Sequence, residues 1–593
     1  MKVSMPVSWG GTLGANGYHH FGEPARDEKN TLIFSGFIKN RHQLTKNTSQ
    51  SDAELVLAGI HTQGTDFIKR LEGSFVIASW DGATLSLFRD GFGIKPLYWS
   101  KLGGQFSFST HIRPLLEAGV PAELNEEALP TWLSLRYVPG PETLFKGVFL
   151  VQPGTCLQVK SDGQIETKVF YSLPDGVVDK GISRKLAISN TLDILAKSVS
   201  SAISVSSAQN GVGMLLSSGI DSAAIAALAK GHKITAFTYG MAGQINEIDE
   251  AKGIAGECGF EHISVKGRPD DFKALKDAIF ALEEPLGDAV IAATWRLMTA
   301  AGAHSSVLLS GEGADELMGG YVHHLVYAKL ASFGKKFPRN ARNLMADAMS
   351  AIPAKVWDLM IPYPGKPGKK AFERIGAAIK SLDHPAHSCA ALQSLFSPDE
   401  QRRLLTKEMA SKTNWKADAA ANAISVRWGK GSDIINPLLR ADLAGWNVDY
   451  NMLRMSKLAA ANGIEPVFPY LDRRLVELSL TVPGDYKIKG WQRKVLLRKA
   501  LNGVVSNKIR QKEKHPFTLS TCQVFDAGWT KLVSKTLSEE SVRQRGWFNP
   551  LEVAKIRDAA PDNLLYDKQR AALVILELWA RMYLDKASLP WQD

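Results

Sequence analysis

The sequence contains few cysteines and no long apolar run. Only Cys156, Cys258, Cys389 and Cys522 occur among 593 residues, and no two of them stand at the spacing of metal ligands. Scattered thiols in a chain of this length predict neither a disulfide framework nor a zinc site, and they are typical of a reducing compartment. The first six residues lack the apolar core of a signal peptide, and no stretch is long enough to span a membrane. We therefore expect a cytoplasmic protein without a membrane partner.

The chain also lacks a concentrated basic segment. Its net charge is +11, yet the lysines and arginines are spread along the whole length. A nucleic-acid partner is therefore not expected. Positive potential around a cleft would instead favour a phosphate-rich cofactor and an acidic substrate. With 45% hydrophobic and 22% charged residues, the chain is long enough for two or more folded domains.

Residues 214–224, MLLSSGIDSAA, predict a strand, a tight turn of small residues and a helix. In such a turn backbone N–H groups approach an oxyanion closely, and the hydroxyls of Ser217, Ser218 and Ser222 add further donors. A carboxylate at Asp221 would repel bare phosphate, but it would hold a Mg²⁺ that bridges to phosphates. The lysine of a Walker loop is absent after the glycine. The stretch therefore predicts a magnesium-dependent phosphate site of a different type.

A second glycine-rich segment, SGEGADELMGGY at 310–321, follows strand-like residues 306–309. The SSGIDS motif at 217–222 resembles the pyrophosphate loop, Ser-Gly-Gly-x-Asp-Ser, of ATP pyrophosphatases that cleave ATP to AMP and pyrophosphate. Together the two segments resemble the signatures of the asparagine synthetase superfamily. The nucleotide site of that superfamily is built from two strand ends, which agrees with ligand binding at the carboxyl edge of a parallel sheet.

Residues 1–173 are expected to form the first domain. The pattern is β-rich, and Asp-Gly pairs at 81–82 and 162–163 predict two hairpins. The segment RDGFGIKPLYW at 89–99 resembles the glutamine-hydrolysing domain of the same superfamily. The resemblance implies an N-terminal-nucleophile αββα sandwich.

The glutaminase itself is expected to be lost. The nucleophile of that family is a cysteine exposed at the chain terminus, whereas position 2 here is Lys2 and the first cysteine is Cys156. The family's substrate-holding Asn-Gly-Glu is replaced by Ser35-Gly36-Phe37, which removes the amide and the carboxylate that would hold glutamine.

Residues 185–593 are expected to form the second domain. A helix over 185–200 is followed by strands that alternate with helices, which predicts a doubly wound parallel sheet of the ATP-pyrophosphatase type. Beyond Tyr321 the periodicity predicts helices almost throughout. By resemblance, residues 238–240 lie near the adenine. Residues 283–288 belong either to the substrate pocket or to an acidic surface turn.

A third block, residues 453–472, resembles the family pattern Asp-Arg-x-Ser-Met-Ala-x-x-x-Gly-x-Glu-x-Arg-x-Pro-Phe-Leu-Asp. It departs at Leu453, Lys457 and Val467, where the family has Asp, Met and Arg. We expect these changes where the acceptor or donor group of the substrate would lie, so the substrate need not be free aspartate.

The family's Lys-x-x-Leu-Arg occurs at Lys494, with Arg498 one helical turn further on, either supporting Lys494 or forming a surface pair. Lys494 would place its ammonium against the α-phosphate and the departing pyrophosphate. Residues 512–517 loosely resemble the closing Lys-x-Gly-Phe loop. By resemblance, Asp221 and Asp315 are the Mg²⁺ ligands, and the ATP-binding residues are Leu216, Ser217, Ser218, Gly219, Asp221, Ser222 and Gly311. Glu312, and as a second candidate Glu465, would orient or deprotonate the amine, the alternative being structural carboxylates.

The resemblance implies an enzyme that uses MgATP to convert a carboxylate into an acyl-adenylate, after which an amine attacks to give an amide and AMP. Without a glutaminase, we expect the amine to be part of the substrate, as in β-lactam synthetases and lasso-peptide cyclases. The leading hypothesis is a lasso-peptide macrolactam synthetase, because β-lactam synthetases carry Tyr at the position of Glu312. The expected partner is a peptide or a small-molecule carboxylate, with a leader peptidase as a further candidate. An ammonia-dependent asparagine synthetase, an amidotransferase acting on a sugar acid, and a non-catalytic binding protein remain alternatives.

Overall fold

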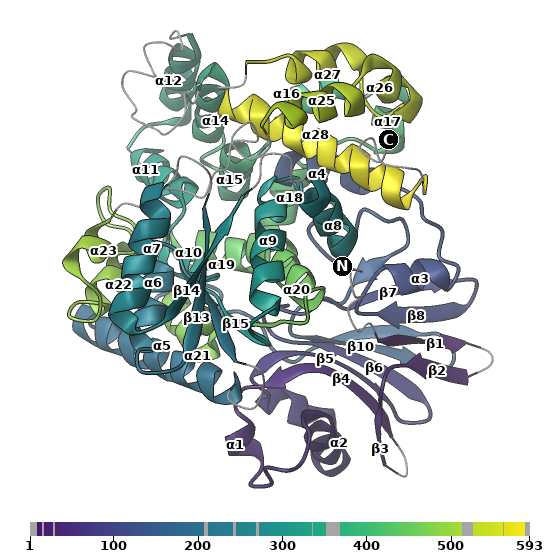
Figure 1. Ribbon diagram of the computed structural model, residues 1–593. Helices are drawn as coiled ribbons and strands as arrows, with labels where there is room; N and C mark the ends of the chain where they lie inside the picture. Colours follow the sequence, from purple (N-terminus) through teal and green to yellow (C-terminus); the bar gives the residue numbers. More distant parts are fainter. Residues whose placement is uncertain are drawn as a thin grey trace.

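The computed structural model describes residues 9–14, 17–27, 30–206, 211–240, 245–267, 272–334, 336–351, 368–512, 526–560 and 563–586. An antiparallel sandwich, a parallel sheet and a helical region follow one another along the chain, and they lie at the bottom, in the middle and at the top of Figure 1. None of the described helices combines the length and the apolar character of a membrane-spanning segment.

Two antiparallel sheets form the first domain, as the sequence predicts. One has the order β2-β1-β8-β7-β9 and the other β11-β10-β6-β5-β4-β3. Their bounds are β1 Gly10–Gly14, β2 Gly17–Phe21, β3 Ala25–Arg26, β4 Thr31–Ile38, β5 Gly73–Trp80, β6 Thr84–Arg89, β7 Tyr98–Leu102, β8 Gln105–Ser109, β9 Phe149–Leu150, β10 Thr155–Lys160 and β11 Ile165–Val169. Both predicted hairpins are confirmed, because Trp80 pairs with Leu85 and Val159 with Ile165.

The two sheets bury their facing side chains against one another. Leu13, Phe106 and Phe108 of one sheet pack with Ile33 and Val76 of the other. The outer face of the six-stranded sheet is covered by helix α2 (Asp52–Gln63) and the 3₁₀ helix that follows it. The six-stranded sheet is thus covered on both faces, and β5 and β6 are buried along almost their whole length.

The RDGFGIKPLYW segment builds the contact with the second domain. The buried Arg89 guanidinium donates to the carbonyls of Lys95, Val151 and Gly93, and the Asp90 carboxylate accepts from the N–H groups of Phe92 and Ile94. These bonds fix the loop at 91–95. Its end then meets the second domain through Lys95, whose ammonium lies 2.7 Å from Oε2 of Glu465. In this structure the segment holds the two domains together.

The second domain contains a five-stranded parallel sheet with the order β14-β13-β12-β15-β16. The bounds are β12 Val212–Leu215, β13 Ile234–Gly240, β14 Glu261–Lys266, β15 Val307–Leu309 and β16 Glu465–Val467. Helices α6 (Ile220–Leu228) and α7 (Ile245–Cys258) lie on one side of it, and α9 (Val290–Gly302) lies on the other (Figure 1). The expected doubly wound arrangement is therefore present.

The expectation of helices almost throughout beyond Tyr321 is confirmed for the described residues, with residues 465–467 as an exception. These residues form β16, which pairs in parallel with β15 through Val307 and Glu465. A three-residue strand that contains Pro466 has no alternating pattern of its own, because its pairing comes from a distant part of the chain.

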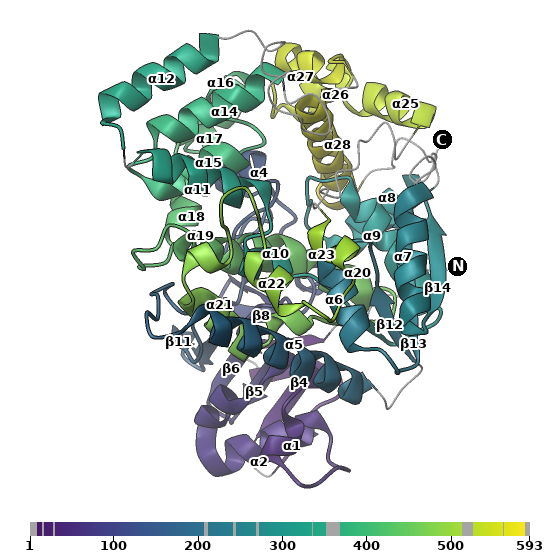
Figure 2. The same cartoon turned by 90° about the vertical axis from the view of Figure 1, so that its left-hand side faces the viewer.

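Helices make up most of the remaining chain (Figure 2). Those used below are α4 Leu129–Leu135, α5 Arg184–Ser206, α10 Ala314–Met318, α11 Val322–Gly334, α15 Pro385–Gln393, α19 Asn436–Ala444, α20 Leu453–Ala460, α21 Arg473–Thr481, α22 Val495–Ala500 and α28 Leu564–Tyr583. A π-helical segment, Trp446–Met452, joins α19 to α20. Such segments are rare and often occur at functional sites.

Candidate active site

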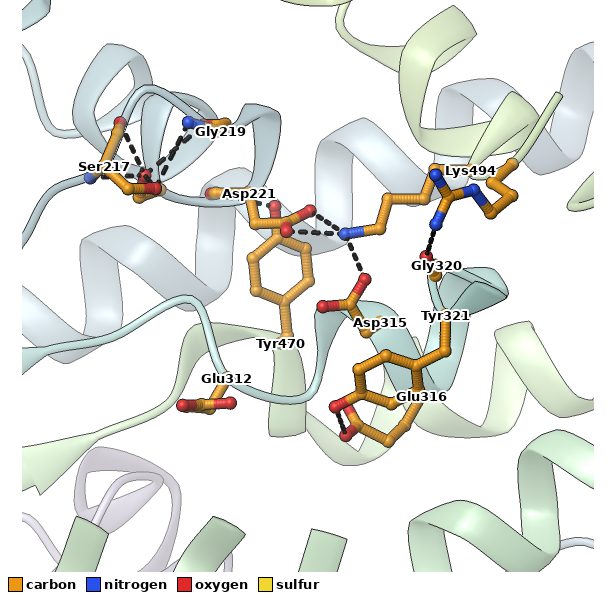
Figure 3. Close-up of polar contacts among 12 residues, drawn as sticks. Ser217, Gly219, Asp221, Glu312, Asp315, Glu316, Gly320, Tyr321, Tyr470 and Lys494 are labelled. Carbon is orange, nitrogen blue, oxygen red and sulfur yellow. Dashed lines mark hydrogen bonds and ion pairs between the residues drawn. The ribbon is translucent and has the colours of Figure 1, made fainter. Parts of the chain in front are cut away.

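The predicted phosphate loop lies between β12 and α6, at the carboxyl end of the parallel sheet (Figure 3). Ser222 closes the turn, since its hydroxyl accepts from the Ser217 N–H at 3.0 Å and donates to the Ser217 carbonyl at 3.1 Å. The N–H of Gly219 points to the Ser217 hydroxyl at 3.2 Å. Backbone N–H groups and the start of a nine-residue helix are thus gathered in one small turn. This arrangement suits an anionic ligand.

Asp221, Asp315 and Lys494 meet beside this loop although they come from three distant segments (Figure 3). The Lys494 ammonium lies 2.5 and 2.6 Å from the two Asp221 oxygens and 2.6 Å from Oδ1 of Asp315. Two carboxylates held this close repel one another unless a cation lies between them. Carboxylate oxygens are also the protein ligands that Mg²⁺ prefers, so the donor set fits the expected ion.

The backbone around Lys494 is unusual. Lys494 has φ 56° and ψ 32°, a left-handed conformation that costs most non-glycine residues about 1 kcal/mol or more. It stands directly before α22, and the neighbouring Arg493 donates to the Gly320 carbonyl at 2.8 Å. Both features direct the Lys494 side chain across Gly320 toward the two aspartates.

Gly320 is required by this close approach. A Cβ at that position would lie 1.8 Å from Oδ1 of Asp315 and 2.2 Å from Cε of Lys494. Gly311 has more room, since its Cβ would lie 3.3 Å from the Asp221 side chain. The second glycine of the MGGY motif therefore makes space for the charged group itself.

Glu312 faces another direction. Figure 3 shows its carboxylate apart from Asp315 and Lys494, and the guanidinium of Arg454 donates to it at 2.7 Å. The Glu312 side chain is 27% exposed, whereas Arg454 is buried and lies over the Tyr450 ring. Glu312 is thus oriented and reachable, as its predicted role requires, but that role stays a prediction.

Glu316 is buried directly beside Asp315. Its Oε1 accepts from the Tyr321 hydroxyl at 2.5 Å and from the Asn451 amide at 2.8 Å. Burial, reinforced by the negative charge of Asp315, raises the pKa of Glu316 to about 8. Trp446 extends the network, because its indole N–H donates to the Tyr321 hydroxyl at 3.1 Å.

The structure does not bring Glu465 into the group around Lys494. Glu465 is the first residue of β16, at the amino end of the strand, whereas the loop with Glu312 follows the carboxyl end of β15. Its Oε2 is used by Lys95 of the first domain. In the described residues, the contact of Glu465 is therefore structural.

The three substituted residues of the third block are buried. Lys457 is 1% exposed and its ammonium lies 2.5 Å from Oε2 of Glu283, while Leu453 and Val467 are buried. Glu283 and Glu284 are themselves 0% and 4% exposed, so an acidic surface turn is excluded. The expectation that these changes lie where the substrate binds is wrong for Lys457, because its ammonium is paired with Glu283 inside the protein.

Arg498 and Lys512 make contacts around the site that the sequence did not predict. Arg498 donates to the backbone carbonyls of Arg493, Arg510 and Lys512 instead of contacting the Lys494 side chain. Lys512 reaches the Ser218 hydroxyl at 2.7 Å and also contacts Glu250. The rest of the predicted closing loop, residues 513–517, lies outside the described residues.

Two further contacts position the site. The Tyr470 hydroxyl donates to the Asp221 carbonyl at 3.1 Å, and the Thr238 hydroxyl donates to the Leu216 carbonyl at 2.8 Å. Thr238 thereby fixes the end of β13 beside the phosphate loop. Both residues stand within segments that the sequence singled out, but only the fold reveals what they contact.

A cluster of His323, His324 and Asp442 could also suggest a metal site, because one ligand atom from each lies within 4.8 Å of the others. Both Nε2 atoms contact the same Asp442 oxygen, at 2.6 and 2.8 Å. His324 Nδ1 accepts from the Tyr321 N–H, so its Nε2 carries the proton and donates to Asp442. A metal-bound histidine would have the opposite arrangement, so this cluster fits a hydrogen-bonded network.

Comparison with known proteins agrees with both halves of the chain. The family model described as glutamine amidotransferase domain matches residues 23–171, and the model described as asparagine synthase matches residues 191–581. A "Putative asparagine synthetase (glutamine-hydrolyzing)" of Mycobacterium tuberculosis is 30% identical over 522 residues, which cover 84% of this chain and 76% of that protein. Asparagine synthetase (glutamine-hydrolyzing) 1 of Bacillus subtilis is 26% identical over 592 residues, which cover 95% and 87% of the two chains.

Proposed function

The chain belongs to the asparagine synthase family and is an ATP-dependent carbon–nitrogen ligase, and from this premise we propose that its amine does not come from glutamine. The observation that carries the proposal is Phe37 on β4. It occupies the position at which the resemblance places the carboxylate that holds glutamine, and it is half-buried in a pocket that Phe75, Phe92 and Phe170 also line. A phenyl ring has no oxygen to accept hydrogen bonds from the ammonium group of glutamine, and it carries no negative charge to pair with that group.

The charged group beside the phosphate loop supports the adenylating half of the proposal. Asp221 and Asp315 would hold Mg²⁺, which supplies charge neutralisation for the phosphates. The loop from Leu216 to Ser222, with Gly311 opposite Asp221, would hold the nucleotide. Lys494 would then place its ammonium where negative charge accumulates as pyrophosphate leaves.

The amide-forming half rests on Glu312. Its carboxylate is oriented by Arg454 and is partly exposed beside the reaction loop, so it can accept a proton from an attacking amine. We propose that the carboxylate and the amine belong to one peptide, as in a lasso-peptide macrolactam synthetase that joins an N-terminal amine to an Asp or Glu side chain. A leader peptidase would then act on the same peptide.

The second candidate is an asparagine synthetase that uses free ammonia. It is favoured by the similarity to proteins named as asparagine synthetases along most of the chain. In this case free aspartate would be the carboxylate, and the altered first domain would have no role in supplying ammonia.

Pyrophosphate release with MgATP separates these candidates. One reaction contains aspartate with ammonium, a second contains aspartate with glutamine, and a third contains peptides with a free N-terminal amine and an internal Asp or Glu. Peptide-dependent release, with loss of one water from the peptide by mass, supports the macrolactam synthetase. Release with aspartate and ammonium alone supports the second candidate. Release with glutamine, accompanied by glutamate formation, would refute the loss of glutaminase.

A further inference from the structure

Three distant segments meet at Gly287, away from the phosphate loop. The end of α4 in the first domain, the loop 283–288 and helix α28 contribute to this junction. A Cβ on Gly287 would lie 3.1 Å from the Ala572 Cβ of α28 and 3.3 Å from the Arg136 Cβ. The Gly287 N–H also donates to the Arg136 carbonyl at 2.9 Å. The three segments are therefore in close contact at Gly287, and a side chain at this position would have little room.

Two cations, Arg136 and Lys568, lie at the junction close to Asp288. Arg136 is the C-cap of α4, and Lys568 stands one helical turn before Ala572 on α28. Asp288 pairs with Arg136 at 3.6 Å, which is too long for a good hydrogen bond. Burial and the neighbouring Arg136 charge both lower the pKa of Lys568. Asp288 and Asp567 oppose this decrease but do not reverse it, so the two cations still repel each other.

One buried donor of Arg136 remains without an acceptor among the described residues. The Arg136 Nε is buried and has no hydrogen-bond partner there. A buried donor without a partner costs free energy, and native proteins rarely leave one unused. Lys568 is partly exposed, and no hydrogen bond or ion pair of its ammonium is found among the described residues. An anion at the junction would give the Arg136 Nε an acceptor and Lys568 a counter-charge.

The backbone of Arg136 is also held in an unfavourable state. Its φ is 71° and its ψ 8°, in the left-handed region that arginine seldom adopts. The conformation aims the guanidinium at the ring of Trp446, 5.1 Å from the ring centroid. Strain of this kind persists where the surrounding structure needs the side chain in one place.

Trp446 connects the junction to the reaction loop. It stacks on Tyr450 with centroids 4.0 Å apart, and Arg454, the partner of Glu312, lies over Tyr450. Its indole N–H donates to the Tyr321 hydroxyl beneath Asp315. Trp446, Arg136 and Asp288 are all partly exposed, so a substrate can reach them.

From these contacts we infer that Arg136 and Lys568 form a subsite that binds a carboxylate of the substrate. The inference rests on the proposed function, in which the substrate carries a carboxylate. The phosphates of ATP are accounted for by the loop around Ser217, so the anion at this second place comes from the other substrate. The planar fork of Arg136 suits a carboxylate, and the Trp446 ring offers an apolar face to the carbon chain next to it. The first domain then supplies a specificity-determining residue, Arg136, to the second.

Binding of glutarate, a small dicarboxylate, tests the subsite directly. The thermal unfolding midpoint of the full chain is measured against glutarate at constant ionic strength, with a non-hydrolysable MgATP analogue filling the nucleotide site. Parallel titrations use inorganic phosphate. We expect glutarate to raise the midpoint of the parent, and the apparent dissociation constant to rise about ten-fold in Arg136→Asn and in Lys568→Met, which is the size of one hydrogen bond to a charged group. Asn tolerates the left-handed backbone.

Lys586→Asn is the matched control. Lys586 is another cation with a positive φ, 52°, and it stands beyond the far end of α28, so its glutarate titration should match the parent. Equal glutarate binding by the parent and both subsite variants would overturn the inference. Phosphate that binds as tightly as glutarate and is lost in the same variants would also overturn it, because the subsite would then recognise phosphate.

Kinetics provide the second readout. For whichever carboxylate supports pyrophosphate release in the parent, we expect the KM of that carboxylate to rise about ten-fold in both variants, while kcat and the KM of ATP stay within about two-fold. A fall in kcat without a change in KM would contradict a binding role. If no carboxylate supports release in the parent, the proposed function fails, and the glutarate titration still decides on the subsite.

Discussion

Lys457→Met should destabilise the protein although methionine is the residue that the family pattern has at this position. The Lys457 ammonium lies 2.5 Å from Oε2 of Glu283 and 2.8 Å from the Leu282 carbonyl, and it lies over the Tyr98 ring of the first domain. Both members of the pair are essentially unexposed, at 1% and 0% of their side-chain surface. Methionine fills a similar volume but leaves Glu283 with Arg113 as its one remaining ion-pair partner among the described residues.

The expected loss in the free energy of unfolding depends on the hydrogen bonds that Glu283 retains in the variant. Removing one member of a buried ion pair costs about 3–5 kcal/mol. Glu283 retains the Ile112 N–H at 2.8 Å, the Arg113 N–H at 3.1 Å and the Arg113 Nε at 2.9 Å. Because three donors remain, we place the loss at the lower end, about 3 kcal/mol. Glu283→Gln in the Lys457→Met background should recover part of it, because it removes the buried negative charge and its amide oxygen can still accept the two bonds from Arg113.

A double-mutant cycle measures this coupling. Urea unfolding of the parent, the two single variants and the double variant is followed by tryptophan fluorescence, and the coupling free energy should be at least about 2 kcal/mol. Burial alone would raise the pKa of Glu283, but the nearby Lys457 charge outweighs it and the pKa falls to about 2, from 4.5. The pair therefore stabilises the fold above pH 4.5, and this stabilisation is lost as pH falls toward 2. A loss below about 1 kcal/mol at pH 7, with no coupling, would refute the reasoning.

Three further changes test the site and its surroundings. Lys494→Met should lower the rate of pyrophosphate release about 10²–10³-fold, because the positive charge at the leaving group is gone; a fall of less than ten-fold in a variant with parental circular dichroism would contradict this role. Gly320→Ala should abolish release, since its Cβ would lie 1.8 Å from Oδ1 of Asp315, whereas Gly253→Ala, whose Cβ meets nothing within 4 Å, should leave release unchanged. Burial raises the pKa of Glu284 to about 7, from 4.5, so its protonation stabilises the fold below pH 4.5 and this contribution is lost as pH rises through 7. The free energy of unfolding of Glu284→Gln, measured in urea, should therefore rise relative to that of the parent between pH 4.5 and 7, by up to about 1.4 kcal/mol per pH unit, and a constant difference would contradict the shift.

The sequence predicted those parts of the site that are local. The phosphate loop is a strand, a turn and a helix within eleven residues, so its residue types alone restrict its structure. Both hairpins followed from Asp-Gly turns for the same reason. That Lys494, Asp221 and Asp315 belong to one site was expected only through the family resemblance, because no local pattern indicates which distant side chains will meet; their direct ion pairs were not predicted.

Long-range contacts account for what the sequence did not predict. β16 is three residues long and exists because β15 offers a free edge. Lys457 looked like a change in substrate recognition, yet its partner Glu283 comes from a remote loop and leaves no periodic signal. Charge in a sequence shows that a partner is needed, but not where that partner is. The same limit applies to Arg136 and Lys568, which lie in different domains.

The contacts between the domains explain why the first domain would be kept after glutamine hydrolysis is lost. Arg89 and Asp90 fix a loop whose Lys95 reaches Glu465, and Tyr98 lies beneath Lys457. These contacts run along the edge of the parallel sheet that carries the reaction loop. A change at Phe37 would remove none of them, because Phe37 takes part in none of these contacts, although it lines a pocket with residues of both domains. A domain attached in this way can lose its own chemistry and still position Arg136 beside Trp446, so selection on the ligase is sufficient to preserve it.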